Sequence, residues 1–339
     1  MKTIYRLFFL LLLQCFAAQQ LKAQKIPEDY RWGRTDFQKV INTHDDGFIT
    51  LSASKGKFQQ HTVIKINSEG ELLYRYEADP EKMFKRFIKD GETWFDRNLF
   101  ELSNGNVAVW FSASKDNRCP GDLYYYILNP QGQLLQASTV PFGKNYKNID
   151  NPKLDNIVMV NDNEAIISVS HGPSCKEIFN NSAMNKTVLY NLSTGDIKPL
   201  NELDGHEVMS CVAEKGYVYL LTLPIRFYRN DNGVKEYRER ENRQFRLWKL
   251  NSIYEVQTSQ GYYDLWEGAI IPKMKLEEKN IRLFYCRQMY SEVEFGYKLL
   301  DKESLVQRNV KVYTAKLFEK DPYAESDKYF MYGSTIISD

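Results

Sequence analysis

Short β-rich runs separated by polar turns repeat along this chain from about residue 37 onward. The clearest pairs of runs are 48–54 with 63–74, 107–114 with 125–135, and 165–170 with 187–197. Each second run contains an Asn and a Gly typical of a tight turn, and Gly70, Gly132 and Gly195 lie 62 and 63 residues apart. A fixed period of this length indicates an architecture built from repeated structural units.

Every repeat shows the same order of elements. A first strand ends in a polar turn such as Asp45-Asp46-Gly47, and a β-rich second strand follows. A third strand ends in the Asn–Gly turn, where glycine takes a positive φ without steric cost, and a short fourth strand completes the unit. Four antiparallel strands with no helical spacing between them predict one blade of a β-propeller.

The later repeats follow this order less regularly. Strands are expected within 208–223, 245–251, 280–290 and 295–303. The segment 329–337 is expected to close the ring against residues 30–39. With about 60 residues per unit, the predicted fold is all-β, a single β-propeller of five to six four-stranded blades. The alternative is an array of β-sandwiches, which would need short, regularly spaced strands without this closed four-strand order.

The first two repeats resemble bacterial β-propeller repeats found in exported Bacteroidetes proteins, whose pattern is GGFI…G…IxKxNxxGxLxW. The matching residues are Asp46-Gly47-Phe48-Ile49 and the run from Ile64 to Tyr74. The resemblance covers about residues 37–200 and implies an exported propeller. That group has no single activity, so the resemblance implies no catalytic residue.

The first 23 residues have the three-part build of a secretory signal peptide. Two basic residues precede the apolar run 7–13, and Ala23 offers a cleavage site, with Ala18 as the alternative. A membrane span needs about 20 apolar residues, so this run is too short to serve as a transmembrane anchor. We therefore expect a signal peptide at 1–23, a propeller domain at 24–339 and a periplasmic or secreted protein.

Composition agrees with this fold and narrows the partners. Apolar residues make up 43% of the chain, enough for a core, and the aromatic content of 14% favours β-strands. The 45 Lys and Arg residues nearly balance 44 Asp and Glu residues, for a formal charge of +1. Such a balance excludes a general nucleic-acid-binding surface.

Ligands of the propeller fold commonly bind where the chain leads into each innermost strand, at one end of the central channel. In three repeats these leading segments combine aromatic rings with carboxylates. The candidate ligand-binding residues are Trp94, Asp96, Arg97, His206, Glu207, Tyr263, Asp264, Trp266 and Glu267. Aromatic rings stack on sugar faces and carboxylates accept hydrogen bonds from hydroxyls, which favours a polyhydroxylated ligand. The other interpretation is that these rings only wedge neighbouring blades together.

A second candidate surface lies in the segment 226–249, which holds eight basic residues, four acids and five aromatic residues. The turn signal Asp231-Asn232-Gly233 predicts a long hairpin that extends beyond its blade. The candidate partner-binding residues are Arg226, Tyr228, Arg229, Tyr237 and Arg238. The hairpin suits an acidic partner, an anionic glycan or lipid headgroups, or it only protects an exposed sheet edge through its mixed charges.

No catalytic motif is recognisable, and the four histidines lack metal-ligand spacing, so we expect no metal and no cofactor. The expected function is therefore an exported, non-enzymatic binding or scaffold module for a glycan or a cell-envelope protein. The alternative is a carbohydrate-active hydrolase or lyase that uses carboxylates at the rim of the channel. Such an enzyme would place two carboxyl groups within about 5–10 Å in one pocket.

Four cysteines remain after removal of the signal peptide. Cys119 and Cys175 both follow the second strand of consecutive repeats, so we expect neighbouring loops to bring them together as a disulfide. Cys211 and Cys286 occupy different ranks within their repeats and are expected to be buried free thiols.

Overall fold

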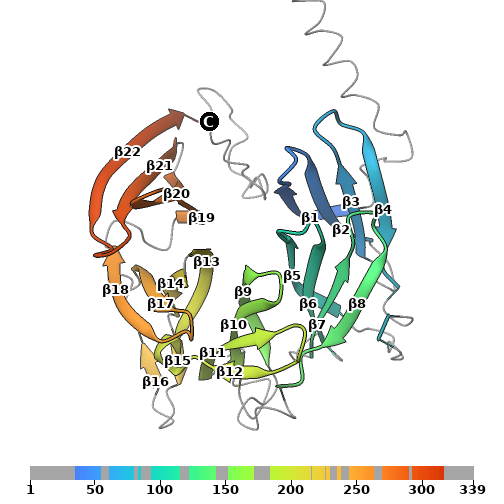
Figure 1. Ribbon diagram of the computed structural model, residues 1–339, viewed down its shortest axis with the longest axis horizontal. Coiled ribbons are helices and arrows are strands. Elements are labelled where there is room, and N and C mark those ends of the chain that lie inside the picture. Colours follow the sequence, from blue (N-terminus) through green and yellow to red (C-terminus); the bar gives the residue numbers. More distant parts are fainter. Residues whose placement is uncertain are drawn as a thin grey trace, which may run out of the picture.

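The computed structural model describes residues 35–54, 61–79, 83–84, 93–114, 122–142, 152–171, 184–214, 216–225, 227–229, 235–237, 244–262, 269–289 and 292–316. Their strands form five antiparallel sheets that stand around a central axis (Figure 1). The fold is a five-bladed β-propeller, which confirms the predicted class at the lower blade number and excludes the β-sandwich array.

Each blade contains four strands that pair in chain order from the innermost to the outermost. Blade 1 consists of β1 (Thr35–Asn42), β2 (Phe48–Ser54), β3 (His61–Ile66) and β4 (Leu72–Glu77). Blade 2 consists of β5 (Thr93–Glu101), β6 (Val107–Ser114), β7 (Leu123–Leu128) and β8 (Leu134–Thr139). Blade 3 consists of β9 (Lys153–Asn161), β10 (Glu164–His171), β11 (Met184–Asn191) and β12 (Ile197–Pro199).

Blade 4 consists of β13 (His206–Glu214), β14 (Tyr217–Pro224), β17 (Phe245–Asn251) and β18 (Val256–Tyr262). Blade 5 consists of β19 (Ala269–Leu276), β20 (Asn280–Met289), β21 (Glu292–Asp301) and β22 (Gln307–Lys316). A 3-10 helix, η1 (Asn201–Leu203), lies between blades 3 and 4. In the described part of the chain, no helix is long and apolar enough to cross a membrane. The expected closing strand at 329–337 lies outside the described residues.

The predicted hairpin is present between β14 and β17, and it belongs to the sheet of the preceding blade. Its strands β15 (Phe227–Arg229) and β16 (Lys235–Tyr237) pair antiparallel with each other. β15 also pairs in parallel with β11 of blade 3, through Met184 and Arg229. The hairpin therefore joins blade 4 to blade 3 at the backbone level.

Apolar side chains pack between adjacent blades. Four buried clusters join blade 1 to 2, 2 to 3, 3 to 4 and 4 to 5. Both faces of a middle strand are covered in this way, so β7 is buried at every position from Leu123 to Leu128. Trp110 and Tyr125 of blade 2, for example, both contact Tyr190 of blade 3 edge to face. This packing explains why the middle strands read as continuous apolar and aromatic runs rather than alternating ones.

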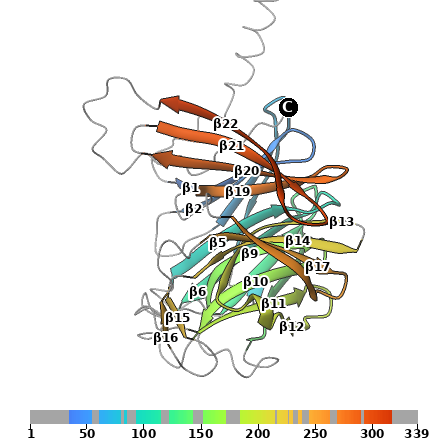
Figure 2. The same cartoon turned by 90° about the vertical axis from the view of Figure 1, so that its left-hand side faces the viewer.

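The two ends of the propeller differ in their connections (Figure 2). At one end, which we call the turn end, short turns join the first strand of each blade to the second and the third strand to the fourth. At the other, the loop end, longer connections join the second strand to the third and each blade to the next. The loop end is where the chain leads into every innermost strand.

One turn of the repeat explains why the sequence period fades after residue 200. The turn between the third and fourth strands contains a residue with positive φ, which is Gly70, Gly132 or Gly195 in blades 1 to 3. In blades 4 and 5 the same conformation is taken by Tyr254 (φ 65°) and Leu305 (φ 59°). The backbone shape is thus kept while the glycine that marks it in sequence is replaced.

The side chains of these two replacements contact the neighbouring blade. The Tyr254 hydroxyl donates a hydrogen bond to Glu164 Oε2 of blade 3, 2.6 Å away. Leu305 is fully buried in the cluster between blades 4 and 5, and its carbonyl accepts a hydrogen bond from the Tyr262 hydroxyl. An unfavourable backbone conformation is therefore offset by contacts between blades.

Candidate binding site at the loop end

Every innermost strand contains a β-bulge at a similar depth from the loop end, where it has one residue more than its partner strand. The bulged residues are Gln38 in β1, Asp96 and Arg97 in β5, Asp155 in β9, Met209 in β13, and Ile271 and Pro272 in β19. Bulges interrupt a ladder, re-aim side chains and are frequent next to functional sites. Here five of them form a ring around the central axis.

Several rim residues chosen from the sequence lie on this ring or beside it. Trp94 is near the start of β5, and Asp96 and Arg97 form the bulge of that strand. His206 and Glu207 are the first two residues of β13. Both groups thus lie where the chain leads from the loop end into an innermost strand. The remaining candidates, Tyr263, Asp264, Trp266 and Glu267, lie outside the described residues. The ligand-binding role of the whole set remains a prediction.

His206 packs against the second and third strands of its own blade, β14 and β17. Its side chain is buried, and Nδ1 lies 3.0 Å from the Thr222 hydroxyl oxygen. That hydroxyl also accepts a hydrogen bond from the Trp248 indole N–H at 2.9 Å, and the imidazole meets the indole edge to face. These contacts fix the start of β13 and leave the partly exposed Glu207 as the next side chain at the rim.

The connection from blade 3 to blade 4 is held by side chains of β11. Asp204 accepts hydrogen bonds from the Thr187 backbone N–H at 3.0 Å and from Lys186 Nζ at 2.7 Å. Asn185 accepts a hydrogen bond from the Gly205 N–H at 2.8 Å. Because these partners are buried, they hold the segment leading into β13 in one conformation.

Asn185 also connects this segment to the bulge of the neighbouring strand. Its amide donates to Asp155 Oδ2 at 2.9 Å, and the Ser170 hydroxyl donates to the same oxygen at 2.7 Å. The bulged carboxylate of blade 3 and the rim of blade 4 therefore share one hydrogen-bonded network. Side-chain networks of this kind preorganise a binding surface.

The residue that follows each bulge is polar in all five blades. These residues are Lys39, Asn98, Asn156, Ser210 and Lys273. Lys39 Nζ donates to Asn98 Oδ1 at 2.6 Å, which links blades 1 and 2. Burial, together with the positive charge of Lys273, lowers the pKa of Lys39 to about 8. The charge of Lys273 in the last blade thus acts on Lys39 in the first.

A recurring hydroxyl next to the bulges was not recognised in the sequence. Ser52, Ser112, Ser168 and Thr222 occupy the second strands of blades 1 to 4, each paired close to a bulge, and all four are buried. Ser168 Oγ, for example, donates to the Asn156 carbonyl and accepts from the Val208 N–H. A hydroxyl repeated inside otherwise apolar strands was the available signal, as in Leu51-Ser52-Ala53 and Phe111-Ser112-Ala113.

The hairpin and cysteine predictions are covered only in part by the described residues. Tyr228, Arg229 and Tyr237 lie on β15 and β16, but only their backbone is described, and Arg226 and Arg238 lie outside. Cys119 and Cys175 also lie outside, so their disulfide remains a prediction. Cys211 is a free thiol whose pKa is raised to about 12 by burial, as expected, and Cys286 lies on β20.

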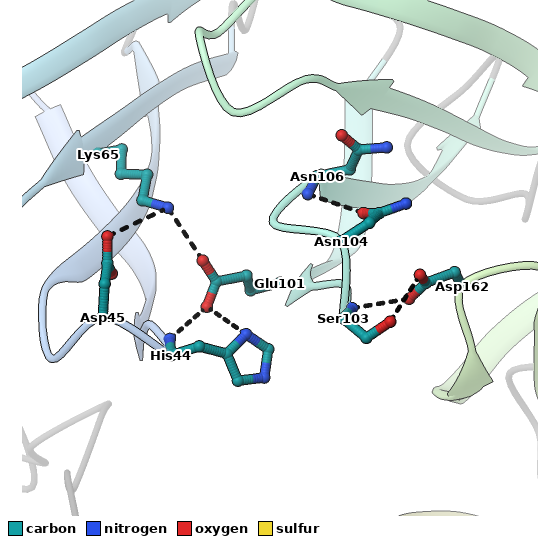
Figure 3. Close-up of polar contacts among 8 residues, drawn as sticks. All are labelled: His44, Asp45, Lys65, Glu101, Ser103, Asn104, Asn106 and Asp162. Atoms are coloured by element: carbon teal, nitrogen blue, oxygen red, sulfur yellow. Dashed lines mark hydrogen bonds and ion pairs between the residues drawn. The ribbon is translucent and has the colours of Figure 1, made fainter.

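The turn end holds a different set of polar contacts, which fasten blades to one another (Figure 3). Glu101 of blade 2 accepts hydrogen bonds from the His44 backbone N–H at 2.6 Å and from Lys65 Nζ at 2.9 Å, both in blade 1. Asp162 of blade 3 accepts from both the backbone N–H and the hydroxyl of Ser103 in blade 2, each at 2.7 Å. In both cases a carboxylate of one blade binds the turn of the preceding blade.

No cluster of three or more His, Cys, Asp or Glu side chains that could hold a metal ion occurs among the residues that the structure describes.

Comparisons with known proteins relate the chain to others by structure alone. No protein-family profile matches it, and no curated protein matches its sequence. An apocarotenoid oxygenase of Synechocystis is similar over 81% of this chain and 59% of its own, at 11% identity and a TM-score of 0.44. This chain therefore spans about three-fifths of that enzyme.

Two carbohydrate-active enzymes are similar at a comparable level. One is a polysaccharide lyase, an ulvan lyase, at 10% identity over 80% of this chain and 82% of its own, with a TM-score of 0.37. The other is an α-L-arabinofuranosidase of Podospora anserina, at 11% identity over 77% of this chain and 87% of its own, with a TM-score of 0.37. None of these similarities identifies a ligand or a reaction for this chain.

Proposed function

We propose that this protein is an exported, non-enzymatic propeller that binds a glycan at its loop end. The observation that carries the proposal is the ring of five bulges, each followed by a polar residue, at the end where the chain leads into the innermost strands. A ring of this kind places one polar residue of each blade around the central axis, the arrangement that multivalent recognition of a sugar chain requires. Export rests on the signal-peptide pattern of residues 1–23.

The two lysines that follow bulges on this ring favour an acidic glycan. Lys39 and Lys273 place two cationic side chains on it, close enough for the charge of one to disfavour protonation of the other. A carboxylate or sulfate group on the ligand would relieve that repulsion. The basic hairpin around β15 and β16, attached to blade 3, adds positive charge on the same end.

Calorimetric titration with purified polysaccharides tests this proposal. Alginate and polygalacturonate are expected to bind, and neutral dextran is not. The Lys39→Met and Lys273→Met variants should each weaken acidic-glycan binding at least about tenfold, a loss of roughly 1.4 kcal/mol. Lys279→Met, which removes an exposed lysine at the turn end, is the matched control and should bind as the unaltered protein does. Binding that is absent, or equal in all variants, would contradict the proposal.

The enzymatic alternative has one observation in its favour. Asp96 and Asp155 are bulged residues of neighbouring innermost strands, so two acidic residues occupy equivalent backbone positions in blades 2 and 3. Paired carboxylates are the groups that glycosidic acid–base chemistry uses. Size-exclusion chromatography of the same polysaccharides after incubation separates the cases. Shortened chains that Asp96→Asn no longer produces would establish the enzyme, whereas unchanged chains with measurable binding support the binding module.

A further inference from the structure

The turn end gathers nearly all of the exposed large apolar side chains of the described part of the chain. Nine such residues are between 39% and 56% exposed, and eight of them lie in the turns or at the first positions of the strands that leave them. The eight are Phe48, Leu72, Leu73, Leu134, Leu135, Tyr217, Ile253 and Val306. They come from blades 1, 2, 4 and 5. Scattered apolar residues need no explanation, but eight of nine on one end of a molecule indicate an interaction surface.

Part of this surface follows the repeat itself. Leu72, Leu134, Ile197 and Val256 occupy the same position, two residues after the positive-φ residue of the turn between the third and fourth strands, in blades 1 to 4 respectively. Blade 5 has Gln307 at this position and carries the exposed Val306 one residue earlier. Each blade therefore presents an aliphatic side chain at the outer rim of the turn end. The blade structure itself does not force a side chain at this position to be exposed, because Ile197 and Val256 pack partly against the clusters between blades.

The same end carries an excess of acid. The residues between the paired strands include ten carboxylates and three lysines, although the whole chain has a formal charge of only +1. The acids are Asp45, Asp46, Glu69, Glu71, Asp162, Asp196, Glu255, Glu277, Glu278 and Glu303, and the lysines are Lys215, Lys279 and Lys302. An acidic face repels an anionic membrane surface and attracts a cationic partner.

We propose that the turn end docks a basic, amphipathic polypeptide segment of a partner protein. Its apolar side chains would cover the exposed ring of aliphatic residues, and its Lys or Arg side chains would meet the carboxylates of the turns. The backbone beneath this surface is held by contacts between blades, as at Glu101 and Asp162, so little ordering would accompany binding. The proposal concerns the end opposite the glycan site and stands independently of it.

Fluorescence anisotropy with two designed peptides tests the proposal on the full mature chain. One peptide alternates Lys and Leu, and its partner of equal length alternates Glu and Leu. The Lys–Leu peptide is expected to bind, with an affinity that falls as salt is raised, and the Glu–Leu peptide is not. Equal binding of the two peptides, or of neither, would overturn the proposal.

Matched variants locate the binding surface. The double variant Leu73→Ser/Leu135→Ser, at two exposed positions, is expected to weaken binding of the Lys–Leu peptide about tenfold or more. Val312→Ser alters an equally exposed residue on β22, away from the turns, and should leave binding unchanged. Equal weakening by Val312→Ser would contradict the location.

Sedimentation of the protein alone separates a foreign partner from a second copy of this chain. A monomer at micromolar concentration supports the proposal. A self-association that the double serine variant abolishes would mean that the turn end binds another copy through its basic hairpin, and would overturn the proposal of a separate partner.

Discussion

The turn end and the loop end of this propeller are built from the same strands yet are stabilised in opposite ways. At the turn end, carboxylates of one blade bind the preceding blade, as Glu101 does with His44 and Lys65. At the loop end, burial and the positive charge of Lys273 disfavour the protonated form of Lys39 and lower its pKa. The comparison indicates that polar contacts at the turn end stabilise the fold, whereas the buried charge of Lys39 at the loop end destabilises it. Such a loss of stability is common at functional sites.

The largest effect is expected where a turn-end glycine meets a neighbouring blade. Gly132 and Gly195 share φ 76°, but a Cβ on Gly132 would lie 2.5 Å from the Tyr74 ring of blade 1, whereas one on Gly195 would meet nothing within 4 Å. Gly132→Ala should lower the free energy of unfolding by about 3 kcal/mol, because strain and overpacking add. Gly195→Ala should cost about 1 kcal/mol, from strain alone. Urea denaturation measures both, and equal losses would refute the difference.

A smaller loss is expected when the buried pair at the turn end is broken. Lys65 and Glu101 are each about 6% exposed at the side chain. Glu101→Gln should therefore lower the free energy of unfolding by about 2 kcal/mol, because the Lys65 charge would lose its buried partner. Glu77→Gln breaks the exposed pair with Arg75 in the same protein and should cost no more than about 0.5 kcal/mol. Similar values for the two variants would contradict a turn end that holds blades together through buried charge.

At the loop end, removal of a charged side chain is expected to raise the free energy of unfolding rather than lower it. The pKa of Lys39 is lowered from 10.5 to about 8, so the unfolded chain binds this proton more tightly than the folded one. Stability should therefore rise with pH between about 8 and 10.5. Lys39→Met should remove that rise and, after the loss of the hydrogen bond to Asn98 is counted, stabilise the protein at pH 7 by about 1.5 kcal/mol. Thermal unfolding across this pH range checks it, and a variant less stable at pH 7 would contradict the comparison.

The smallest effect concerns the tyrosine that replaces a turn glycine. Tyr254→Phe keeps the ring and the positive φ but removes the hydrogen bond to Glu164 of blade 3. The expected loss is about 1 kcal/mol, measured by the same denaturation. Tyr217→Phe changes an exposed hydroxyl at the same end of the same blade and should leave stability unchanged.

The fold could be predicted from the sequence because its period is marked by turn chemistry. Gly70, Gly132 and Gly195 fixed the first three blades, while Tyr254 and Leu305 hid the same turn in the last two. A non-glycine residue with positive φ cannot be recognised from its residue type, because the contact with the neighbouring blade that stabilises it is not visible in the sequence. The sequence therefore allows five or six blades, and the five sheets of the structure decide between them.

The sequence predicts at which end of the propeller the candidate site lies, but not the bulges or the lysines that form it. Counting residues back from the turns placed Asp96 and Arg97 at the loop end, where they form the bulge of β5. The bulges themselves depend on the pairing register between the first and second strands of each blade, which the residue pattern of the innermost strand alone does not record. The cations Lys39 and Lys273 lie 234 positions apart, and only the arrangement of the five blades around one axis lets the charge of Lys273 act on Lys39.

The arrangement of the apolar clusters has a consequence for how the chain acquires its structure. Each described cluster joins a blade to the one that follows it in the chain, about 60 residues later. A growing polypeptide can therefore add blades in order, each using the previous one as a template, as in other repeat proteins. Placing blade 5 beside blade 1 requires all five blades and must come last. A chain truncated within blade 5 would then keep an ordered stack of blades that never becomes a ring.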